Sequence, residues 1–407
     1  MKNRKVIIES QLKASSYEIL IGNGVIGDCG KWTRKCLGKD TAKIVIVSNP
    51  TVYKLYGATV ASRLAGAGFA VSHWLMKDGE EHKNFRSVEK VLAFLGEAGL
   101  TRTDAVVALG GGVVGDLAGF AAAVYMRGVK FVQMPTTLLA MIDSSVGGKA
   151  GVNTDAGKNS TGAFHQPSGV LVDPNVLATL SQRELTAGFC EMIKHGALSG
   201  PKLLSRTSEF LAEFPLSSFS QLGDLAKLKS DNSQFNNENP ALKSEISNLK
   251  YEVGQLIESN VRFKATIVAG DERESAKRRD NKSRKILNFG HTFAHALEKV
   301  TDYKYFKHGE AVGYGILYAA DLSKTLALCD KNDVKLLYDV VHSVGPLPTL
   351  AGIDSQKVFE AFRFDKKVIA GLLQMVLVKG IGKPVIVDSG DIPRSAHTKA
   401  LKKLLKP

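Results

Sequence analysis

The residues of this chain best suited to hold a metal ion are histidines and a glutamate on three predicted helices. His291 and His295 lie four residues apart, a spacing that places both imidazoles on one face of a helix. His308 begins a second predicted helix, and Glu191 lies on a third. A glutamate with two histidines leaves room for substrate oxygens, as in catalytic zinc sites. The spacing alone favours both His291 and His295 as ligands.

Glycines and hydroxyls follow two predicted strands directly. The apolar run 105–109 predicts a buried parallel strand, and three consecutive glycines come immediately after it. Glycine lets backbone N–H groups approach a phosphate, and the N-terminus of the next helix favours its negative charge. The run is not a strict dinucleotide fingerprint, so a tight turn also explains it. The candidate nucleotide contacts are Gly111, Gly112, Gly115, Asp116, Thr136 and Thr137.

Cationic side chains accumulate beside these glycines and the candidate metal ligands. Any one of them could be an ordinary solvated charge, but a charge that faces a cleft needs an anionic partner. Their clustering favours a small, highly anionic substrate. They are Arg127, Lys149, Lys158, Lys194, Lys264, Arg284 and the pair Lys366-Lys367.

The 407-residue chain carries a net charge of +14, which by itself would also suit a nucleic-acid partner. No aromatic-rich nucleic-acid motif accompanies the charge, so we expect no nucleic-acid partner. We also expect no membrane span and no signal peptide, because the apolar runs are too short. The four cysteines form no metal-binding or paired spacing, which is typical of free thiols in the cytoplasm.

Two regions must position these groups. In the first, strands alternate with helices, which predicts a Rossmann-like α/β domain with a mostly parallel sheet over 1–176. The second, 177–407, is predicted to be mainly helical, with a polar surface insertion near 215–250. The predicted strands are 6–9, 17–21, 43–48, 69–75, 105–109, 130–134, 169–173, 374–378 and 384–387. The predicted helices are 87–98, 179–197, 202–214, 250–268, 286–299, 310–328 and 332–344.

Together these residues resemble the 3-dehydroquinate synthase family of sugar phosphate cyclases. The matching segments span most of the chain in the family's order, which makes the set far more specific than any single motif. They include 78–83, 110–116, 127–128, 135–139, 143–149, 157–159, 179–185, 191–196, 264–265, 271–274, 287–291, 308–312 and 365–367.

The resemblance implies bound NAD and Zn²⁺ (or Co²⁺). It makes Glu191, His291 and His308 the metal ligands and turns His295 into a substrate contact. The implied cofactor contacts are Glu80, Lys83, Gly111, Gly112, Gly115, Asp116, Thr136, Thr137, Asp143, Lys149, Lys158, Thr179 and Glu184. The implied substrate pocket comprises Arg127, Asp143, Lys149, Lys158, Asn159, Lys194, Lys264, Arg284, Asn288, His295 and Lys367. It also implies a homodimer in which Arg127 reaches into the neighbouring subunit's site.

The implied reaction converts 3-deoxy-D-arabino-heptulosonate 7-phosphate into 3-dehydroquinate and phosphate. A hydroxyl is oxidised by NAD, phosphate leaves, the hydride returns, and the opened ring closes by an aldol step. Two alternatives remain at this point: another sugar phosphate cyclase, of the deoxyinosose or valiolone type, and a metal-dependent polyol dehydrogenase.

The segment between Glu274 and Asn288 departs from the family pattern, because it lacks a glycine and carries about six extra residues. Arg278 keeps the family's spacing from Glu274, whereas Arg284 keeps the spacing from Asn288. We favour Arg284 as the substrate arginine, because one helical turn would couple it to Asn288 and His291. We therefore expect Arg284→Ala to cost far more turnover than Arg278→Ala.

Overall fold

The computed structural model describes residues 4–8, 16–155, 157–223, 240–362, 368–369 and 372–405. The chain forms two compact units, Met1–Leu180 with Ser218–Ala265, and Ser181–Ser217 with Thr266–Pro407. This division differs from the single predicted boundary at 176, because most of helix α9 (Pro240–Gly270) packs in the first unit. Glu258 of α9 pairs with Arg4 at 3.3 Å, and Arg262 donates to the carbonyl of Lys5 at 3.3 Å.

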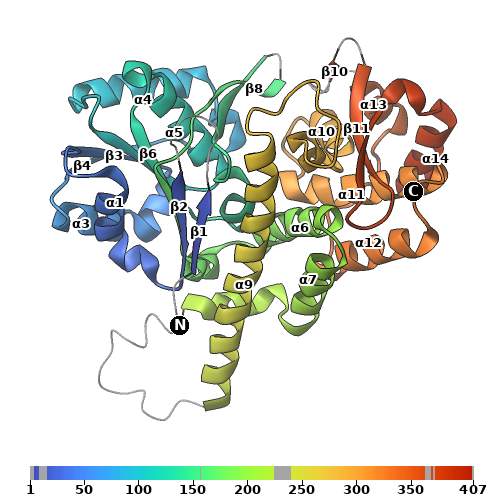
Figure 1. The fold of residues 1–407 in the computed structure, drawn as a ribbon, viewed down its shortest axis with the longest axis horizontal. Coiled ribbons are helices and arrows are strands. Elements are labelled where there is room, and N and C mark those ends of the chain that lie inside the picture. The colour runs from blue at the N-terminus through green and yellow to red at the C-terminus, as the bar shows by residue number, and fades with distance from the viewer. Residues whose placement is uncertain are drawn as a thin grey trace. The chain divides into compact units, whose positions relative to one another are not determined.

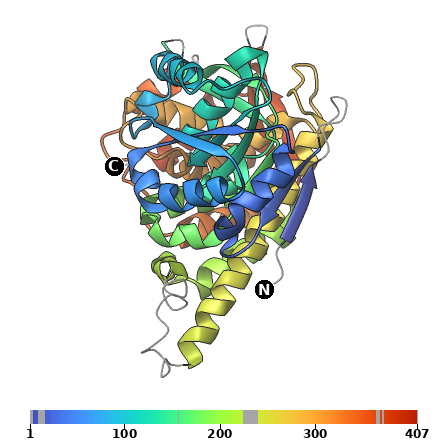
Figure 2. The same ribbon diagram turned by 90° about the vertical axis from the view of Figure 1, so that its left-hand side faces the viewer.

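The first unit is built on a seven-stranded sheet, ordered β1-β2-β9-β6-β5-β3-β4. Figures 1 and 2 show strands of this unit among its helices from two directions. Only β1 pairs antiparallel to its neighbour, and every other neighbouring pair is parallel. The mostly parallel sheet is therefore confirmed. Its strands are β1 (Arg4–Ile8), β2 (Tyr17–Ile21), β3 (Lys43–Ser48), β4 (Ala70–Leu75), β5 (Ala105–Gly110), β6 (Lys130–Pro135) and β9 (Gly169–Val172).

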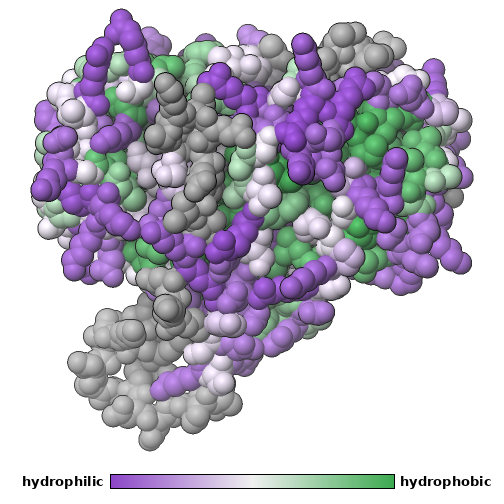
Figure 3. Space-filling view, viewed as in Figure 1, coloured by the Kyte–Doolittle hydropathy of each residue, from purple (hydrophilic) through white to green (hydrophobic). Residues whose placement is uncertain are grey.

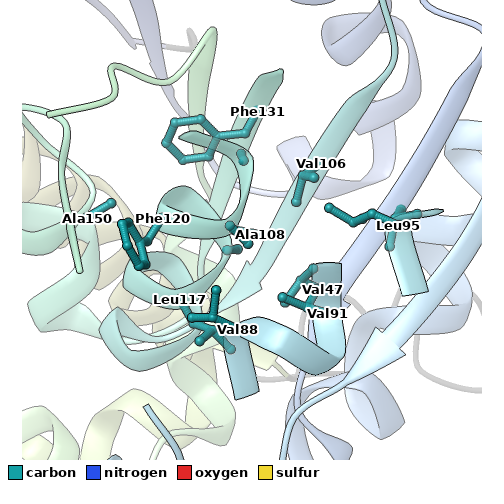
Figure 4. Packing of buried hydrophobic residues seen from close by; sticks show 14 of the residues in the cluster. Val47, Val88, Val91, Leu95, Val106, Ala108, Leu117, Phe120, Phe131 and Ala150 are labelled. Carbon is teal, nitrogen blue, oxygen red and sulfur yellow. The ribbon is translucent and has the colours of Figure 1, made fainter. Parts of the chain in front are cut away.

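Helices cover both faces of this sheet because the strand residues are apolar on both sides. Val47 packs with residues of α4 and α5 (Figure 4), and Val45 belongs to the same cluster, whereas Ile44 and Ile46 pack with α1 and α3. Each fully buried side chain of this size stabilises the fold by about 1.5–3 kcal/mol. The helices are α1 (Cys29–Leu37), α2 (Pro50–Val52), α3 (Ala58–Gly66), α4 (Phe85–Glu97) and α5 (Gly112–Val124).

The order of the strands places the glycine run at a reversal point of the sheet. The chain passes from β3 outward to β4 and then returns to β5 on the other side of β3. In open α/β sheets the ligand crevice lies where the strand order reverses, outside the carboxyl ends of the strands. Gly111 and Gly112 follow β5 at this point. A hairpin of β7 (Lys149–Thr154) and β8 (Gly157–Phe164), which the sequence did not predict, also belongs to this unit.

The second unit is mainly helical, as predicted. Helix α11 (His308–Thr325) packs against α6, α10, α12 and α14, and a small antiparallel sheet β10-β11-β12 completes the unit. The other elements are α6 (Gln182–Ser199), α7 (Pro201–Glu213), α10 (His291–Val300), α12 (Lys331–Ser343), α13 (Ser355–Ala361), α14 (Arg394–Leu404), β10 (Val368–Ile369), β11 (Leu372–Val378) and β12 (Pro384–Asp388).

Two glycines of α11 allow unusually close helix contacts. A Cβ atom on Gly309 would lie 2.0 Å from the carbonyl oxygen of Ala187 on α6. A Cβ atom on Gly315 would lie 2.0 Å from the carbonyl oxygen of Gly290, directly before α10. Real Cβ atoms do not approach a carbonyl oxygen this closely, so both positions require glycine. The glycines thereby bring together α6, α10 and α11, the three helices that carry Glu191, His291 and His308.

The predicted helix 286–299 is interrupted. Arg284–Asn288 forms a short 3₁₀ helix, and α10 begins only at His291, after Gly290 adopts a left-handed conformation with φ of +79°. The expectation that one α-helix couples Arg284 to His291 is therefore wrong. Residues 240–249, predicted within a surface insertion, form the first turns of α9, whereas 224–239 lie outside the described residues.

In the described part of the chain, no helix has both the length and the apolar character needed to cross a membrane. Hydrophilic residues cover much of each unit on the face shown in Figure 3. All four cysteines are described, and each is a free thiol.

Candidate active site

A buried glutamate and two histidines of the second unit converge from three helices. The Oε1 atom of Glu191 lies 3.8 Å from Nε2 of His291 and 3.6 Å from Nε2 of His308. One ligand atom from each of the three residues lies within 4.8 Å of the others. Two imidazole nitrogens and a carboxylate oxygen form the donor set of three-ligand zinc sites that keep a position for substrate. The cluster therefore fits a divalent metal ion.

The two histidines present the same nitrogen to the cluster. Nδ1 of His291 lies 3.2 Å from the carbonyl oxygen of Phe289, which can only accept a hydrogen bond. Nδ1 of His308 lies 3.2 Å from Oε2 of Glu298. If each Nδ1 carries the proton, each Nε2 has a free lone pair directed toward Glu191.

Lys194 supplies a positive charge inside the same cluster. Its Nζ atom lies 2.5 Å from Oε2 of Glu191, three residues earlier on α6, and both side chains are 1% exposed. A buried carboxylate needs a compensating charge, which the ammonium group provides in the absence of a metal ion. His295 lies beside the cluster, with its ring centroid 5.5 Å from that of His291 and 5.9 Å from that of His308.

In the first unit, the predicted nucleotide residues gather around the end of β5. Gly111 caps α5, and a Cβ atom there would lie 2.9 Å from Cγ2 of Thr137. A Cβ atom on Gly115 would lie 2.8 Å from Oε1 of Gln133. Close packing against β6 and the segment after it thus accounts for part of the glycine pattern. The same absence of side chains keeps the first N–H groups of α5 approachable by an anion.

A buried lysine links two predicted cofactor residues. Nζ of Lys83 lies 2.9 Å from Oδ2 of Asp116 on α5 and 3.0 Å from Oε1 of Glu80, while Lys158 lies 3.9 Å from Glu80. Burial alone would lower the pKa of Lys83, but the two carboxylates raise it above its ordinary value. Asn153 donates to Oε1 of Glu80 at 2.9 Å, so the hairpin is tied to the same network.

The hydroxyl of Thr136 has a property expected of a ligand contact. Thr136 directly follows β6 and is 5% exposed, yet its Oγ1 atom makes no hydrogen bond with the described residues. A buried polar atom without a partner is costly unless a ligand or water satisfies it. The hydroxyl of Thr137 accepts from the amide of Ala140 at 3.2 Å and keeps its own proton to donate. The residues at this strand end fit a polar cofactor such as NAD.

The comparisons with known proteins cover both halves of the chain. The family model described as 3-dehydroquinate synthase N-terminal matches residues 73–187, and the model described as 3-dehydroquinate synthase C-terminal matches residues 188–368. The chain belongs to the 3-dehydroquinate synthase family. It is 37% identical over 404 residues to the 3-dehydroquinate synthase of Synechococcus sp., covering 99% of this chain and 100% of that relative. Membership makes the chain an enzyme of the phosphate-eliminating cyclase class, as expected from the sequence.

Solved structures share the fold of the family. A 2-deoxy-scyllo-inosose synthase complexed with carbaglucose-6-phosphate, NAD⁺ and Co²⁺ superimposes with a TM-score of 0.75 at 22% identity, over 99% of this chain and 100% of that chain. A 2-epi-5-epi-valiolone synthase from Streptomyces hygroscopicus with NAD⁺ and Zn²⁺ bound has a TM-score of 0.71 at 27% identity, over 97% and 98% of the two chains.

The structure brings other implied residues of the family into defined contacts. In the first unit, Lys264 pairs with the side chain of Asp143. The amide of Asn159 donates to Asn153 at 2.8 Å, and Lys149 is exposed at the start of β7. Thr179 lies 2.6 Å from the hydroxyl of Tyr56.

In the second unit, Glu184 pairs with Lys307 at 2.6 Å, and Asn288 donates to Oε1 of Glu274 at 3.1 Å. The guanidinium of buried Arg284 donates to the carbonyl of Glu272 at 2.7 Å. Arg127 is exposed in the first unit, with φ of +67°. Lys367 lies outside the described residues.

Sequence reasoning gave no role to two residues that hold predicted site residues in place. Asn153 contacts Glu80 and Asn159, and Glu298 contacts His308. The available signal for Glu298 was its spacing, because it lies seven residues after His291 and three after His295, on the same helix face. Asn153 carried no such signal, because the hairpin that positions it was not predicted.

Proposed function

We propose that this chain is a 3-dehydroquinate synthase that converts 3-deoxy-D-arabino-heptulosonate 7-phosphate into 3-dehydroquinate and phosphate. The observation that carries the proposal is the Glu191–His291–His308 cluster, in a chain whose two halves both match this family. The cofactors are NAD and a divalent metal, Zn²⁺ or Co²⁺, which also occur in the solved cyclases of this fold. When bound, NAD supplies reversible hydride transfer and the metal supplies Lewis acidity toward an alcohol or carbonyl oxygen.

The metal would be held by Glu191, His291 and His308. NAD would be held at the ends of β5 and β6 by the amides following Gly111, by Thr136, and by the network of Lys83, Asp116 and Glu80. Lys83, whose pKa is raised above its ordinary value, pairs with both carboxylates at 2.9 and 3.0 Å and so helps to orient them. Burial raises the pKa of Asp116 even though Lys83 opposes the shift.

The substrate carries a phosphate and a carboxylate, and the chain offers cations for both. Lys149, Lys158, Lys194, Lys264, Arg284 and Lys367 form this set, with Asn159, Asn288 and His295 as hydrogen-bonding groups. The cations fix the orientation of the substrate and stabilise charge that develops as phosphate leaves. No side chain is assigned as the sole general base, because the phosphate of the substrate can itself accept the proton.

The proposal includes a homodimer in which Arg127 completes the neighbouring subunit's site. Met126 and Arg127 adopt positive φ angles of 48° and 67°, a backbone conformation that is uncommon for non-glycine residues and that can be held in place for a functional reason. Val124 and Met126 are 43% and 44% exposed, which suits a surface that a second subunit covers.

A cytoplasmic location is part of the same proposal. The four free thiols support it, because disulfides persist in oxidising compartments and are rare in the cytoplasm. Burial raises the pKa of Cys29 to about 12, so this thiol has little thiolate character and suits a structural role.

The reaction itself provides the test. The purified protein is incubated with the heptulosonate phosphate, a catalytic amount of NAD and zinc, and phosphate release and product are followed. We expect phosphate to appear while absorbance at 340 nm stays flat, because the hydride is returned in each turnover. No phosphate release, with or without metal, contradicts the proposal.

The same assay separates the alternatives. A polyol dehydrogenase would accumulate NADH stoichiometrically and release no phosphate. A deoxyinosose- or valiolone-type cyclase would prefer a sugar phosphate that lacks the carboxylate, so the two substrates are compared in parallel.

The choice between two arginines remains a prediction. Arg284 is buried beside Asn288 in the same 3₁₀ helix and donates to the carbonyl of Glu272, whereas Arg278 is less buried and its guanidinium pairs with the carboxylate of Asp280 at 2.9 Å. We therefore favour Arg284 as the substrate contact. Arg284→Ala should lose at least ten-fold more turnover than Arg278→Ala, since orienting cations contribute effects of this order; equal losses would contradict the assignment.

A further inference from the structure

Glu298 is a buried carboxylate next to the candidate metal cluster. It lies on α10, in the turn after His295, and is 2% exposed. Its Oε2 atom is 3.2 Å from Nδ1 of His308. His308 is the first residue of α11, where no preceding helical turn packs against its side chain, and that side chain is 27% exposed. The orientation of the ring at the start of this helix therefore depends on an external contact.

We propose that Glu298 is a positioning residue for the metal centre. It accepts a hydrogen bond from Nδ1–H of His308, and this bond fixes the tautomer in which Nε2 carries the lone pair. That Nε2 atom lies 3.6 Å from Oε1 of Glu191, on the side where His291 also points. A carboxylate that accepts a hydrogen bond from a ligand histidine holds the ring in place. This inference rests on the proposed metal centre.

The other histidine shows the same arrangement with a different acceptor. Nδ1 of His291 faces the carbonyl of Phe289 at 3.2 Å, and its Nε2 faces Glu191 at 3.8 Å. The main chain thus orients His291, whereas a side chain orients His308. Only the second contact can be removed by substitution without changing the backbone, so His308 is where the effect can be measured.

Glu298 could instead be a ligand, because His295, Glu298 and His308 also have donor atoms within 4.8 Å of one another. A metal ion bound by Glu298 would take Nδ1 of His308, because that nitrogen lies 3.2 Å from Oε2 of Glu298. If a second ion were bound to Nε2 at the same time, the imidazole would have to lose both of its N–H protons. A hydrogen bond to Glu298 instead leaves one proton on Nδ1, as is usual for a histidine that binds a single metal ion. The hydrogen-bonding role is therefore favoured over a second ion.

The test measures zinc binding rather than turnover. Each metal-free protein competes for zinc with a chromophoric chelator. The proteins compared are the wild type, Glu298→Leu, Glu298→Gln and a control, Glu209→Leu, at an exposed position of α7. We expect Glu298→Leu to bind zinc 10- to 100-fold more weakly, the usual effect of removing such a partner. Glu298→Gln keeps an acceptor oxygen without the charge, so its zinc affinity should lie between those of wild type and Glu298→Leu. The zinc affinity of Glu209→Leu should equal that of wild type. The visible spectrum of the Co²⁺ form should change in Glu298→Leu.

Each result decides the inference. The inference is overturned if Glu298→Leu binds zinc as tightly as wild type. It is also overturned if wild type binds two zinc ions and Glu298→Gln binds only one, because Glu298 would then be a ligand. Far-UV circular dichroism of the metal-free forms establishes that each variant folds, and if Glu298→Leu does not, Glu298→Gln carries the test. A wild type that binds no zinc contradicts the metal centre itself, whereas a wild type that binds zinc but releases no phosphate contradicts only the proposed reaction.

Discussion

At the scale of single residues, the candidate metal centre depends on how a buried negative charge is compensated. Glu191 and Lys194 are both almost completely buried, and their charged atoms lie 2.5 Å apart. Removing one partner of a buried ion pair leaves an uncompensated charge, which costs about 3–5 kcal/mol. The ammonium group thus has a second task besides any contact with substrate, because it stabilises the fold when the metal is absent.

Lys194→Met tests this task. Without metal, we expect the free energy of unfolding to fall by about 3–5 kcal/mol relative to wild type. With saturating zinc the difference should shrink, because the divalent ion compensates Glu191 directly. Denaturant unfolding in chelator and in zinc measures both values, with Lys324→Met at an exposed position of α11 as the control. An equal loss under both conditions contradicts the argument.

Two sequence arguments led to different metal ligands: helical spacing favoured His291 with His295, whereas the family resemblance implied Glu191, His291 and His308. The spacing of His291 and His295 suggested that both bind metal, whereas in the structure His308 completes the cluster with Glu191 and His291. Sequence spacing describes one helix only, and His308 comes from another. Glu298 shares a helix face with His291 and His295, but its contact with His308 joins two helices, and spacing along one helix does not report such a contact.

At the scale of elements, the three ligands meet because glycines permit close helix contacts. Gly315 of α11 lies against the carbonyl of Gly290, which itself turns the chain into α10. Any side chain at Gly315 must push α10 away from α11, and the three ligand positions depend on that contact. The contact between Gly315 and the carbonyl of Gly290 thus sets both the packing of α10 on α11 and the relative positions of the three candidate ligands.

Gly315→Ala should therefore destabilise the fold by about 3 kcal/mol, the upper range for overpacking, and should weaken zinc binding as well. Gly96→Ala on α4 is the matched control, because nothing lies within 4 Å of a Cβ atom there and the position is exposed. That change should stabilise the protein by about 0.5–1 kcal/mol, since alanine favours helix. Thermal unfolding and zinc titration provide the measurements, and a neutral Gly315→Ala contradicts the packing argument.

Strands were more predictable than turns and hairpins. β3 and β5 are runs of Val, Ile, Ala and Leu, and their apolar character on both faces predicted a buried parallel sheet. β8 reads Gly-Lys-Asn-Ser-Thr-Gly-Ala-Phe, with few β-branched residues, so local sequence gave no sign of the hairpin. The interruption before α10 depends on the left-handed Gly290, which helical periodicity does not reveal.

At the scale of the whole molecule, one buried histidine should make stability depend on pH. His397 of α14 is 4% exposed and its Nδ1 lies 2.6 Å from the hydroxyl of Tyr318 on α11. Burial lowers its pKa from 6.5 to about 4. The unfolded chain therefore binds a proton between these values that the folded chain does not, so this contribution to stability is complete above pH 6.5 and is lost as pH falls toward 4.

The expected loss between pH 7 and pH 4 is about 2–3 kcal/mol from this group. His397→Gln removes the titration, so its stability should decline less steeply over the same interval, whatever its stability at neutral pH. Denaturant unfolding at pH 7, 6, 5 and 4 gives both slopes. Parallel curves for wild type and variant would show that His397 does not stay neutral in the folded protein.

The units themselves were only partly predictable. The change from alternating strands to helices marked two regions, but residues 218–265 return to the first unit through contacts such as that of Glu258 with Arg4. These partners are more than two hundred residues apart, and no local pattern reports such a return. An interface between subunits is harder still to predict, because its two surfaces come from different chains.

Subunit complementation tests the proposed role of Arg127. Homodimers of Arg127→Ala chains should be inactive because both sites lack the arginine. Homodimers of His308→Ala chains should be inactive because both sites lack a metal ligand. In a mixed dimer, the Arg127→Ala chain keeps its metal ligands and receives Arg127 from its partner, so one of the two sites is complete. Random mixing should then restore about a quarter of wild-type activity. If Arg127 serves its own subunit instead, no mixture regains activity, because no site contains both intact groups.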